Sequence, residues 1–397
     1  MAPLWEKGLP LDQRILRFTA GEDHALDARL VPYDVRASQA HAKMLLARGL
    51  LEADDCAAIC SGLEALGEAH AAGEWTIALE DEDVHGALER RLIERIGPAG
   101  GRVHLGRSRN DQVLAALRLY IKDAIGQTRA SAAAVVASLR ALAREQGAIG
   151  LPGYTHMQPA MPSSVELWAL GFAAALEDDR AGLGAAERRA DTNPLGSAAG
   201  YGVPGLGLDR EATREALGFA TVEEPVTAVQ LSRGKAEATL IFELTLLVGD
   251  LARLASDLIL FYTDEFAYVA LPAQMTTGSS IMPQKRNPDV FELVRGAQAT
   301  IVGALVEALG ITAKLPSGYH RDLQRLKAPL FRSIDLADDC AAIMAHALAG
   351  VRFRPENIRL GDELYAAERA NELVLREGLP FREAYRKVAE MLGKAKK

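Results

Sequence analysis

The sequence contains few cysteines, few aromatic residues and no excess of basic charge. Three cysteines in 397 residues, Cys56, Cys60 and Cys340, cannot build a disulfide framework. Cys56 and Cys60 lie one helical turn apart in an alanine-rich stretch, which favours buried thiols over metal ligands. The net charge of -8 argues against a general binder of nucleic acid or anionic membranes, because such proteins contact phosphates through a basic surface.

Several kinds of motif are also missing. No Walker-type phosphate loop is present, and Gly202, Gly205 and Gly207 follow no predicted strand, so a dinucleotide-binding fingerprint is not indicated. The N-terminus lacks a basic region followed by an apolar run, and no uninterrupted apolar segment is long enough to span a bilayer. We therefore expect a cytoplasmic protein.

Helical periodicity dominates what is present, whereas strand signals are almost absent, with short hairpins expected at most in the glycine-rich connection that ends at Gly207. Leu244, Leu251 and Leu258 repeat every seven residues, which is typical of a seam in a helix bundle. The fold class predicted is mostly α, with a central bundle of about five long helices and two smaller helical regions. The predicted domains are residues 1–102, 103–349 and 350–397. Helices are predicted near 34–51, 54–71, 87–93, 113–146, 164–189, 236–266, 288–309, 330–348, 362–377 and 381–392.

Four polar segments interrupt the helical pattern, at residues 103–112, 151–162, 278–289 and 316–327. Loops on a rigid scaffold are the usual location of a functional site. Prolines and glycines between residues 271 and 288 exclude a continuous helix there. The next helix is predicted to begin with Asn287 as its N-cap and Pro288 at its first position, and its N-terminus favours an anion.

The acidic run Glu80–Asp83 precedes one of the predicted helices. Acidic side chains suit the positive end of a helix dipole. Taken alone, the run is interpreted as a solvated helix N-terminus.

Taken together, the polar segments resemble the fumarase/aspartase superfamily, whose members eliminate a group from a succinyl skeleton and release fumarate. Within that superfamily they are most similar to the argininosuccinate lyases. The resemblance extends from about residue 4 to residue 388. It is carried by residues 106–113, 152–158, 194–197, 278–289 and 322–324, in the family order.

The resemblance implies catalytic roles for four residues. Ser279 matches the base that removes a carbon-bound proton, and nearby positive charge such as Lys285 must stabilise its alkoxide and the carbanion. His156 matches the active-site histidine, and Glu292 matches the carboxylate that pairs with it and raises its basicity. We assign this pair to proton handling and to protonation of the leaving nitrogen. The chemistry requires no metal or organic cofactor.

The resemblance also implies a set of substrate-binding residues, of which Arg109 can hold a carboxylate with two parallel hydrogen bonds. These residues are Ser108, Arg109, Asn110, Thr155, Asn287, Tyr319, Gln324 and Lys327. The implied substrate is argininosuccinate, with arginine and fumarate as products, and neither a nucleic acid nor a membrane is expected as partner. The implied assembly is a homotetramer with active sites shared between subunits, and the heptad seam supports it.

Some positions depart from the family pattern, and alternatives remain. Leu105 stands where threonine is common, Arg286 where lysine is common, and Arg325–Leu326 where an acidic pair is common. The last difference affects how the arginine end of the substrate is held, and the C-terminal region is shorter than in many relatives. The alternatives are another fumarate-releasing lyase, acting on adenylosuccinate or aspartate, and a catalytically silent crystallin-like protein. Against the silent protein stands the joint retention of Ser279, Lys285, Asn287, His156 and Glu292, because a structural protein has no need of all five.

Overall fold

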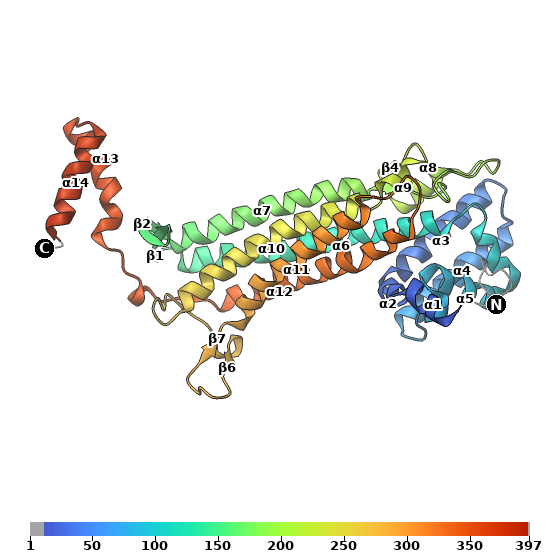
Figure 1. The fold of residues 1–397 in the computed structure, drawn as a ribbon, viewed down its shortest axis with the longest axis horizontal. Helices are drawn as coiled ribbons and strands as arrows, with labels where there is room; N and C mark the ends of the chain where they lie inside the picture. Colours follow the sequence, from blue (N-terminus) through green and yellow to red (C-terminus); the bar gives the residue numbers. More distant parts are fainter. Residues whose placement is uncertain (1–11, 396–397) are drawn as a thin grey trace. The chain divides into compact units, whose positions relative to one another are not determined.

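The computed structural model describes residues 12–395, and most of them are helical (Figure 1). The long helices of the bundle are α6 (Arg109–Gln146), α7 (Val165–Ala190), α10 (Lys235–Tyr262), α11 (Asp289–Thr312) and α12 (Lys327–Gly350). They confirm the predicted central bundle. Leu244, Leu251 and Leu258 of the heptad seam are all fully buried.

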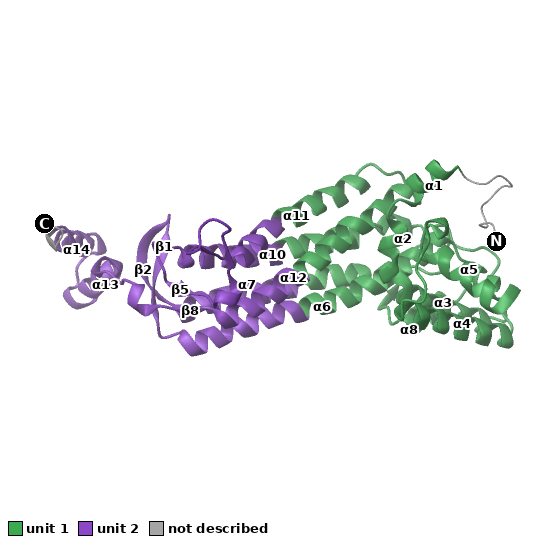
Figure 2. Ribbon diagram, turned by 90° about the horizontal axis from the view of Figure 1, so that it is seen from below, with its two compact units in different colours: residues 1–129, 182–245, 299–337 green, residues 130–181, 246–298, 338–397 purple. Residues whose placement is uncertain are grey.

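The chain divides into two compact units whose boundaries fall inside these five helices (Figure 2). Unit 1 comprises residues 1–129, 182–245 and 299–337, and unit 2 comprises residues 130–181, 246–298 and 338–397. Each long helix therefore contributes one part to each unit. The division into three regions stays a prediction.

Unit 1 contains the small helices that precede the bundle and those that follow α7. Their apolar faces pack into a core in which Leu30, Leu45, Ile59 and Leu92 are fully buried. Burying each such side chain stabilises the fold by roughly 1.5–3 kcal/mol. The helices are α1 (Gln13–Ala20), α2 (Asp23–Leu26), α3 (Val31–Ala47), α4 (Ala53–Ala71), α5 (Val84–Ile96), α8 (Arg210–Leu217) and α9 (Ala228–Ser232). The strands β3 (Thr192–Asn193) and β4 (Thr221–Val222) pair in parallel.

Unit 2 contains a hairpin that the sequence did not predict, formed by β1 (Gly150–Thr155) and β2 (Gln158–Ser164). Its prolines obscured the strand pattern, but Pro152 and Pro162 lie opposite each other in a two-stranded ribbon, where both strands are edges and tolerate proline. The remaining elements are β5 (Val269–Ala270) paired with β8 (Arg352–Phe353), β6 (Thr277–Gly278) paired with β7 (Arg286–Asn287), α13 (Ala366–Glu377) and α14 (Phe381–Ala395).

The start of α7 agrees with the prediction, because the Ser164 hydroxyl accepts a hydrogen bond of 3.1 Å from the Leu167 backbone N–H. The start of α11 differs by one residue. Asn287 belongs to β7, and the Pro288 carbonyl accepts the first helical hydrogen bonds, so the helix begins at Asp289. A proline has no N–H to lose at this position, which explains why the shift is tolerated.

In the described part of the chain, α11 is the one helix that is long and apolar enough to be compared with a membrane span. By length and composition alone it could cross a membrane, although only 28% of the relevant window is buried. The expectation relied on an uninterrupted apolar run, whereas Arg295 and Glu307 interrupt a helix whose mean hydropathy is still high. Its exposed apolar side chains include Leu293, Val306 and Leu309.

The three cysteines are free thiols. Cys56 and Cys340 are buried as expected, whereas Cys60 is half-buried. Burial raises the pKa of both the Cys60 and the Cys340 thiol to about 11, so both stay protonated at neutral pH.

Candidate functional site

The first group of site residues lies at the head of α6, in unit 1. Buried Asp111 fixes this segment: its carboxylate accepts hydrogen bonds from the backbone N–H groups of Ser108 (3.0 Å), Gly196 (3.0 Å) and Ala198 (2.8 Å). One side chain therefore joins the polar segment 103–112 to the segment 194–198. Burial raises the pKa of Asp111 to about 6, against the lowering effect of these three donors.

The acidic run beside this segment is only partly solvated, which corrects the sequence interpretation: Glu80 is exposed, whereas the two residues after it are buried. Asp81 and Glu82 are 7% and 5% exposed. Asp81 forms ion pairs with two arginines of α5, Arg90 at 2.8 Å and Arg91 at 3.1 Å. The positive charges of these arginines hold the pKa of Asp81 below its usual range, against the effect of burial. Their distance along the sequence explains why the run looked solvated.

Asp83 links the acidic run to the substrate-binding residues. Its carboxylate caps α5 by accepting from the Gly86 N–H at 2.9 Å, and it accepts from Arg109 Nε at 3.1 Å. Arg109 Nη2 also pairs with Asp83 and lies 3.8 Å from Glu82. Burial would lower the pKa of Arg109, but the two carboxylates raise it. Arg109 is thus a charged, pre-oriented group.

Lys327 lies at the start of α12 and is buried between two carboxylates of unit 1. Its Nζ is 2.9 Å from Asp23 and 2.6 Å from Asp27. Burial would lower its pKa, but Asp27 and Asp23 raise it. Burial raises the pKa of Asp23 to about 6 despite Lys327. These partners were not predictable from the sequence, because they lie about 300 residues away along the chain.

Gln324 and Tyr319 complete the group in unit 1. Gln324 Nε2 donates to the backbone carbonyls of Thr19 (2.9 Å) and Ala20 (3.2 Å), so its amide is oriented by the end of α1. Tyr319 is half-buried and interacts electrostatically with Arg109. The pair Arg325–Leu326 differs from the acidic pair that is common in the family. Arg325 is exposed, whereas Leu326 is 1% exposed in the core and is therefore a packing residue.

A cavity of about 1310 Å³ opens in unit 1 at the head of α6. Ser108, Arg109 and Asn110 line one part of it, and Glu82 and His104 line another. Its volume is larger than that of a typical site for a small ligand. The cavity therefore has room for a substrate together with ordered water.

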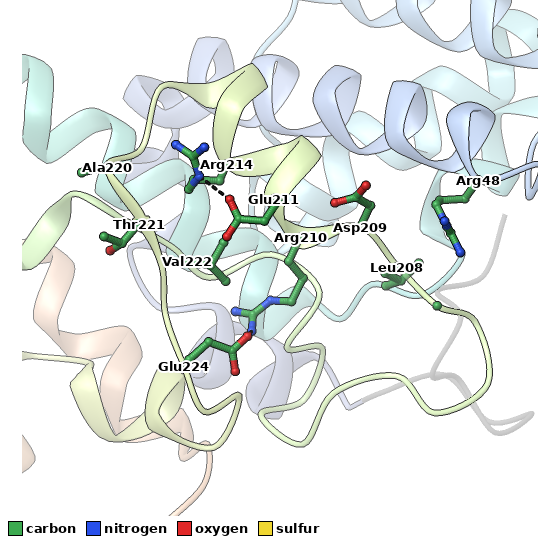
Figure 3. Close-up of a pocket in the computed structure, with 11 residues that line it drawn as sticks. Arg48, Leu208, Asp209, Arg210, Glu211, Arg214, Ala220, Thr221, Val222 and Glu224 are labelled. Carbon is green, nitrogen blue, oxygen red and sulfur yellow. Dashed lines mark hydrogen bonds and ion pairs between the residues drawn. The ribbon is translucent and has the colours of Figure 1, made fainter.

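A second cavity of about 860 Å³ in unit 1 has a different lining, shown in Figure 3. Arg210 pairs there with Glu224 at 2.8 Å, and Arg214 pairs with Glu211 at 2.5 Å. Because none of the predicted site residues lines this cavity, we do not assign it to the site.

The second group of site residues lies in unit 2, where His156 and Met157 form the turn between β1 and β2. Thr155 pairs with Gln158 across a two-residue turn, and His156 and Met157 both have positive φ, 52° and 59°. This matches a type I′ turn, which normally takes asparagine or glycine. Non-glycine residues in this conformation are strained, and such strain concentrates at functional sites. Thr155 and His156 are both exposed.

Ser279 follows β6 in the loop formed by the polar segment 278–289. Its Oγ accepts hydrogen bonds from the backbone N–H groups of Ile281 (3.3 Å) and Met282 (3.2 Å). These donors point at the oxygen on which an alkoxide would carry its charge. The β6–β7 pairing holds the two ends of the loop together, with Thr277 opposite Asn287.

The other residues of this group lie on or after the loop. Lys285 and Glu292 are exposed, and Asn287 is half-buried, with its Nδ2 3.5 Å from Thr277 Oγ1. Within residues 12–395 of this single chain, His156 and Glu292 share no hydrogen bond or ion pair. The pairing of these two side chains stays a prediction.

The sequence model of the lyase family matches residues 10–303. The argininosuccinate lyase of Sorangium cellulosum is 46% identical over 388 residues, covering 97% of this chain and 90% of the relative. The argininosuccinate lyase of Thermotoga neapolitana is 40% identical over 395 residues, covering 99% of both chains.

Solved structures agree in fold. EDDS lyase in complex with formate superposes with a TM-score of 0.82 at 27% identity, covering 98% of this chain and 77% of that chain. The class II fumarase of Schistosoma mansoni gives a TM-score of 0.79 at 18% identity, covering 98% of this chain and 91% of that chain, a likeness of fold alone. The chain is a carbon–nitrogen lyase that belongs to the lyase family and, within it, to the argininosuccinate lyases.

Proposed function

We propose that the chain cleaves argininosuccinate into arginine and fumarate, with Ser279 as the base. The observation that carries this role is the pair of backbone N–H groups donating to Ser279 Oγ. A serine hydroxyl is a weak acid, and donors fixed at the oxygen stabilise its alkoxide. Lys285, six residues further along the same loop, adds positive charge.

The proposed reaction proceeds in balanced steps. The Ser279 alkoxide takes a proton from the methylene carbon next to the carbon that bears the leaving nitrogen, and the electron pair passes into the carboxylate attached to that methylene carbon. Lys285 and Asn287 stabilise the charge that develops there. The carbon–nitrogen bond then breaks, the double bond of fumarate forms, and the departing guanidino nitrogen receives a proton through His156, with Glu292 as its partner.

The strained turn supports the role of His156. Two adjacent non-glycine residues with positive φ cost roughly 1–2 kcal/mol each, and no packing of the exposed His156 or Met157 offsets this cost. A functional demand on the position of the imidazole accounts for the strain. Thr155, directly before the turn, is proposed to bind a substrate carboxylate.

Binding of the substrate is proposed to use both units of the chain, each from a different subunit. Unit 1 supplies Ser108, Arg109, Asn110, Tyr319, Gln324 and Lys327, and unit 2 supplies Thr155, His156, Ser279, Lys285, Asn287 and Glu292. The exposed apolar side chains of α11 support a homotetramer in which this helix packs between subunits. We propose a cytoplasmic enzyme that requires no cofactor and has neither nucleic acid nor membrane as partner.

The activity is tested by following fumarate by its ultraviolet absorbance after mixing the protein with argininosuccinate, adenylosuccinate or aspartate. We expect fumarate only from argininosuccinate. Fumarate from adenylosuccinate alone would reassign the substrate, and none from any of the three would leave a catalytically silent protein.

The base is tested with Ser279→Ala and with the neighbouring Ser280→Ala as a matched control. We expect Ser279→Ala to lower kcat by at least about 10³-fold without changing the oligomeric state, because it removes the group that takes the proton. Ser280→Ala should keep most of the activity, because Ser280 is exposed. Near-normal turnover of Ser279→Ala would remove Ser279 from this role.

A further inference from the structure

Arg233, between α9 and α10 in unit 1, is a buried cation for which no hydrogen bond or ion pair is found within residues 12–395. It is 6% exposed, and its Nε and Nη1 atoms are buried without a hydrogen-bond partner. The guanidinium stacks over the Tyr319 ring in a cation–π contact, with its carbon 5.5 Å from the ring centroid. Because an unpaired buried charge is costly, a group that keeps one has a use for it.

Gln230, on α9 three residues before Arg233, is a second group without a hydrogen-bond partner in the described residues. It is 4% exposed, and neither its amide nitrogen nor its amide oxygen has a hydrogen-bond partner. Gly200 lies against it so closely that an added Cβ would be 2.7 Å from Gln230 Cγ. The segment around Gly200 therefore covers the side chain, while its amide group remains able to bind a ligand.

Three other cations of unit 1 already have carboxylate partners. Arg109, which also interacts with Tyr319, is paired with Asp83, and Lys327 is paired with Asp23 and Asp27. Arg118, which repels Arg233, is paired with Glu223 at 2.6 Å. Two guanidinium groups thus flank Tyr319, and the charge of Arg109 is compensated by the chain itself.

The acidic groups that face Arg233 are Glu237, in the first turn of α10, and Asp23. Both attract the guanidinium, but in the described part of the chain neither lies within the 4.0 Å of an ion pair with it, and Glu237 Oε1 is itself unpartnered. Burial lowers the pKa of Arg233, against the effect of Tyr319 and Glu237. The guanidinium therefore still gains from a further carboxylate at hydrogen-bond distance.

We propose that Arg233 and Gln230 bind the α-carboxylate of the arginine portion of argininosuccinate, beside Tyr319. This assignment rests on the proposed function. An α-amino acid carries a carboxylate and an ammonium group on one carbon, and Arg233 has Asp23 near enough to attract it. Arg233 suits the carboxylate and Asp23 the ammonium, so the pair recognises the amino acid end of the substrate.

The test compares two ligands that differ only in this carboxylate, arginine and agmatine, by isothermal titration calorimetry with the full chain. We expect Arg233→Leu to weaken arginine binding about 10- to 100-fold and to leave agmatine binding unchanged. Arg233→Lys should retain part of the arginine affinity, because it keeps the charge and loses the bidentate geometry. Gln230→Leu should show a smaller loss that is also specific for arginine.

The control variant is Arg48→Leu, which removes the same charge from the cavity in Figure 3 and should bind both ligands normally. We expect the Tm of Arg233→Leu to stay the same or rise, because a buried unpaired charge is removed. Unchanged arginine binding in Arg233→Leu, or an equal loss for both ligands, would overturn the assignment. A lower Tm with an unaltered preference for arginine would identify a structural role and overturn it as well.

Failure of the proposed function would be visible separately, as wild-type protein that releases no fumarate from argininosuccinate. If Arg233→Leu does not fold, Arg233→Lys and Gln230→Leu decide the question by the same ratio of arginine to agmatine affinity. An unchanged ratio in both variants would contradict the assignment.

Discussion

Asp111 holds two polar segments of unit 1 together. It joins the segment carrying Ser108 to the segment 194–198 through three backbone N–H groups, two of them donating to the same oxygen. A carboxamide at this position keeps one acceptor oxygen and so leaves at least one buried N–H unsatisfied, which costs about 1–3 kcal/mol. The proposed substrate-binding residues Arg109 and Asn110 lie between Ser108 and Asp111 in the sequence.

The raised pKa of Asp111 predicts a pH-dependent contribution to stability. Because the folded-state pKa of about 6 exceeds the ordinary value of 3.8, the contribution is fully present below about pH 3.8 and is lost as pH rises through about 6. The difference in unfolding free energy between wild type and Asp111→Asn should therefore shrink between pH 4 and pH 7. Urea unfolding at several pH values measures it, and a difference that grows over this range would contradict the prediction.

The β1–β2 hairpin is the element that the sequence revealed least. Helices were predictable because their apolar stripes are long, as in α6, whose end at Gln146 agrees with the expectation. The hairpin was hidden by its prolines, and its turn by residues that rarely adopt positive φ. The ion pairs of Asp81, Arg109 and Lys327 were unpredictable for another reason, since they join residues from 9 to 304 positions apart.

The strained turn predicts opposite effects of two matched glycine substitutions. Met157→Gly and His156→Gly should each stabilise unit 2 by roughly 1 kcal/mol, because glycine adopts positive φ without steric cost. Only His156→Gly should abolish turnover. Thermal unfolding and fumarate release measure the two effects, and a loss of stability in Met157→Gly would show that the turn is not strained.

At the scale of the whole molecule, the apolar surface of α11 determines the expected assembly. Val306 is 65% exposed and Leu309 is 52% exposed, although the helix is apolar enough to lie in a protein core. A bundle between subunits would cover these side chains.

Val306→Glu is expected to dissociate the proposed tetramer, because it introduces a charge into an apolar interface. The control is Leu375→Glu, the same type of change at an 85% exposed leucine of α13. Size-exclusion chromatography with light scattering reports both masses. A wild-type monomer with full activity would contradict the shared site as well as the tetramer.

The ion pair between Asp83 and Arg109 has a consequence for inhibition of the whole enzyme. Arg109 is held by a carboxylate of its own chain before any ligand arrives. A bound ligand must share the guanidinium with that carboxylate, so association adds a second anion to a compensated cation instead of neutralising a bare one. Simple monoanions such as chloride or acetate therefore gain little at Arg109, and we expect them to inhibit weakly. A succinyl group, with its second carboxylate held elsewhere in the site, can compete with the internal partner.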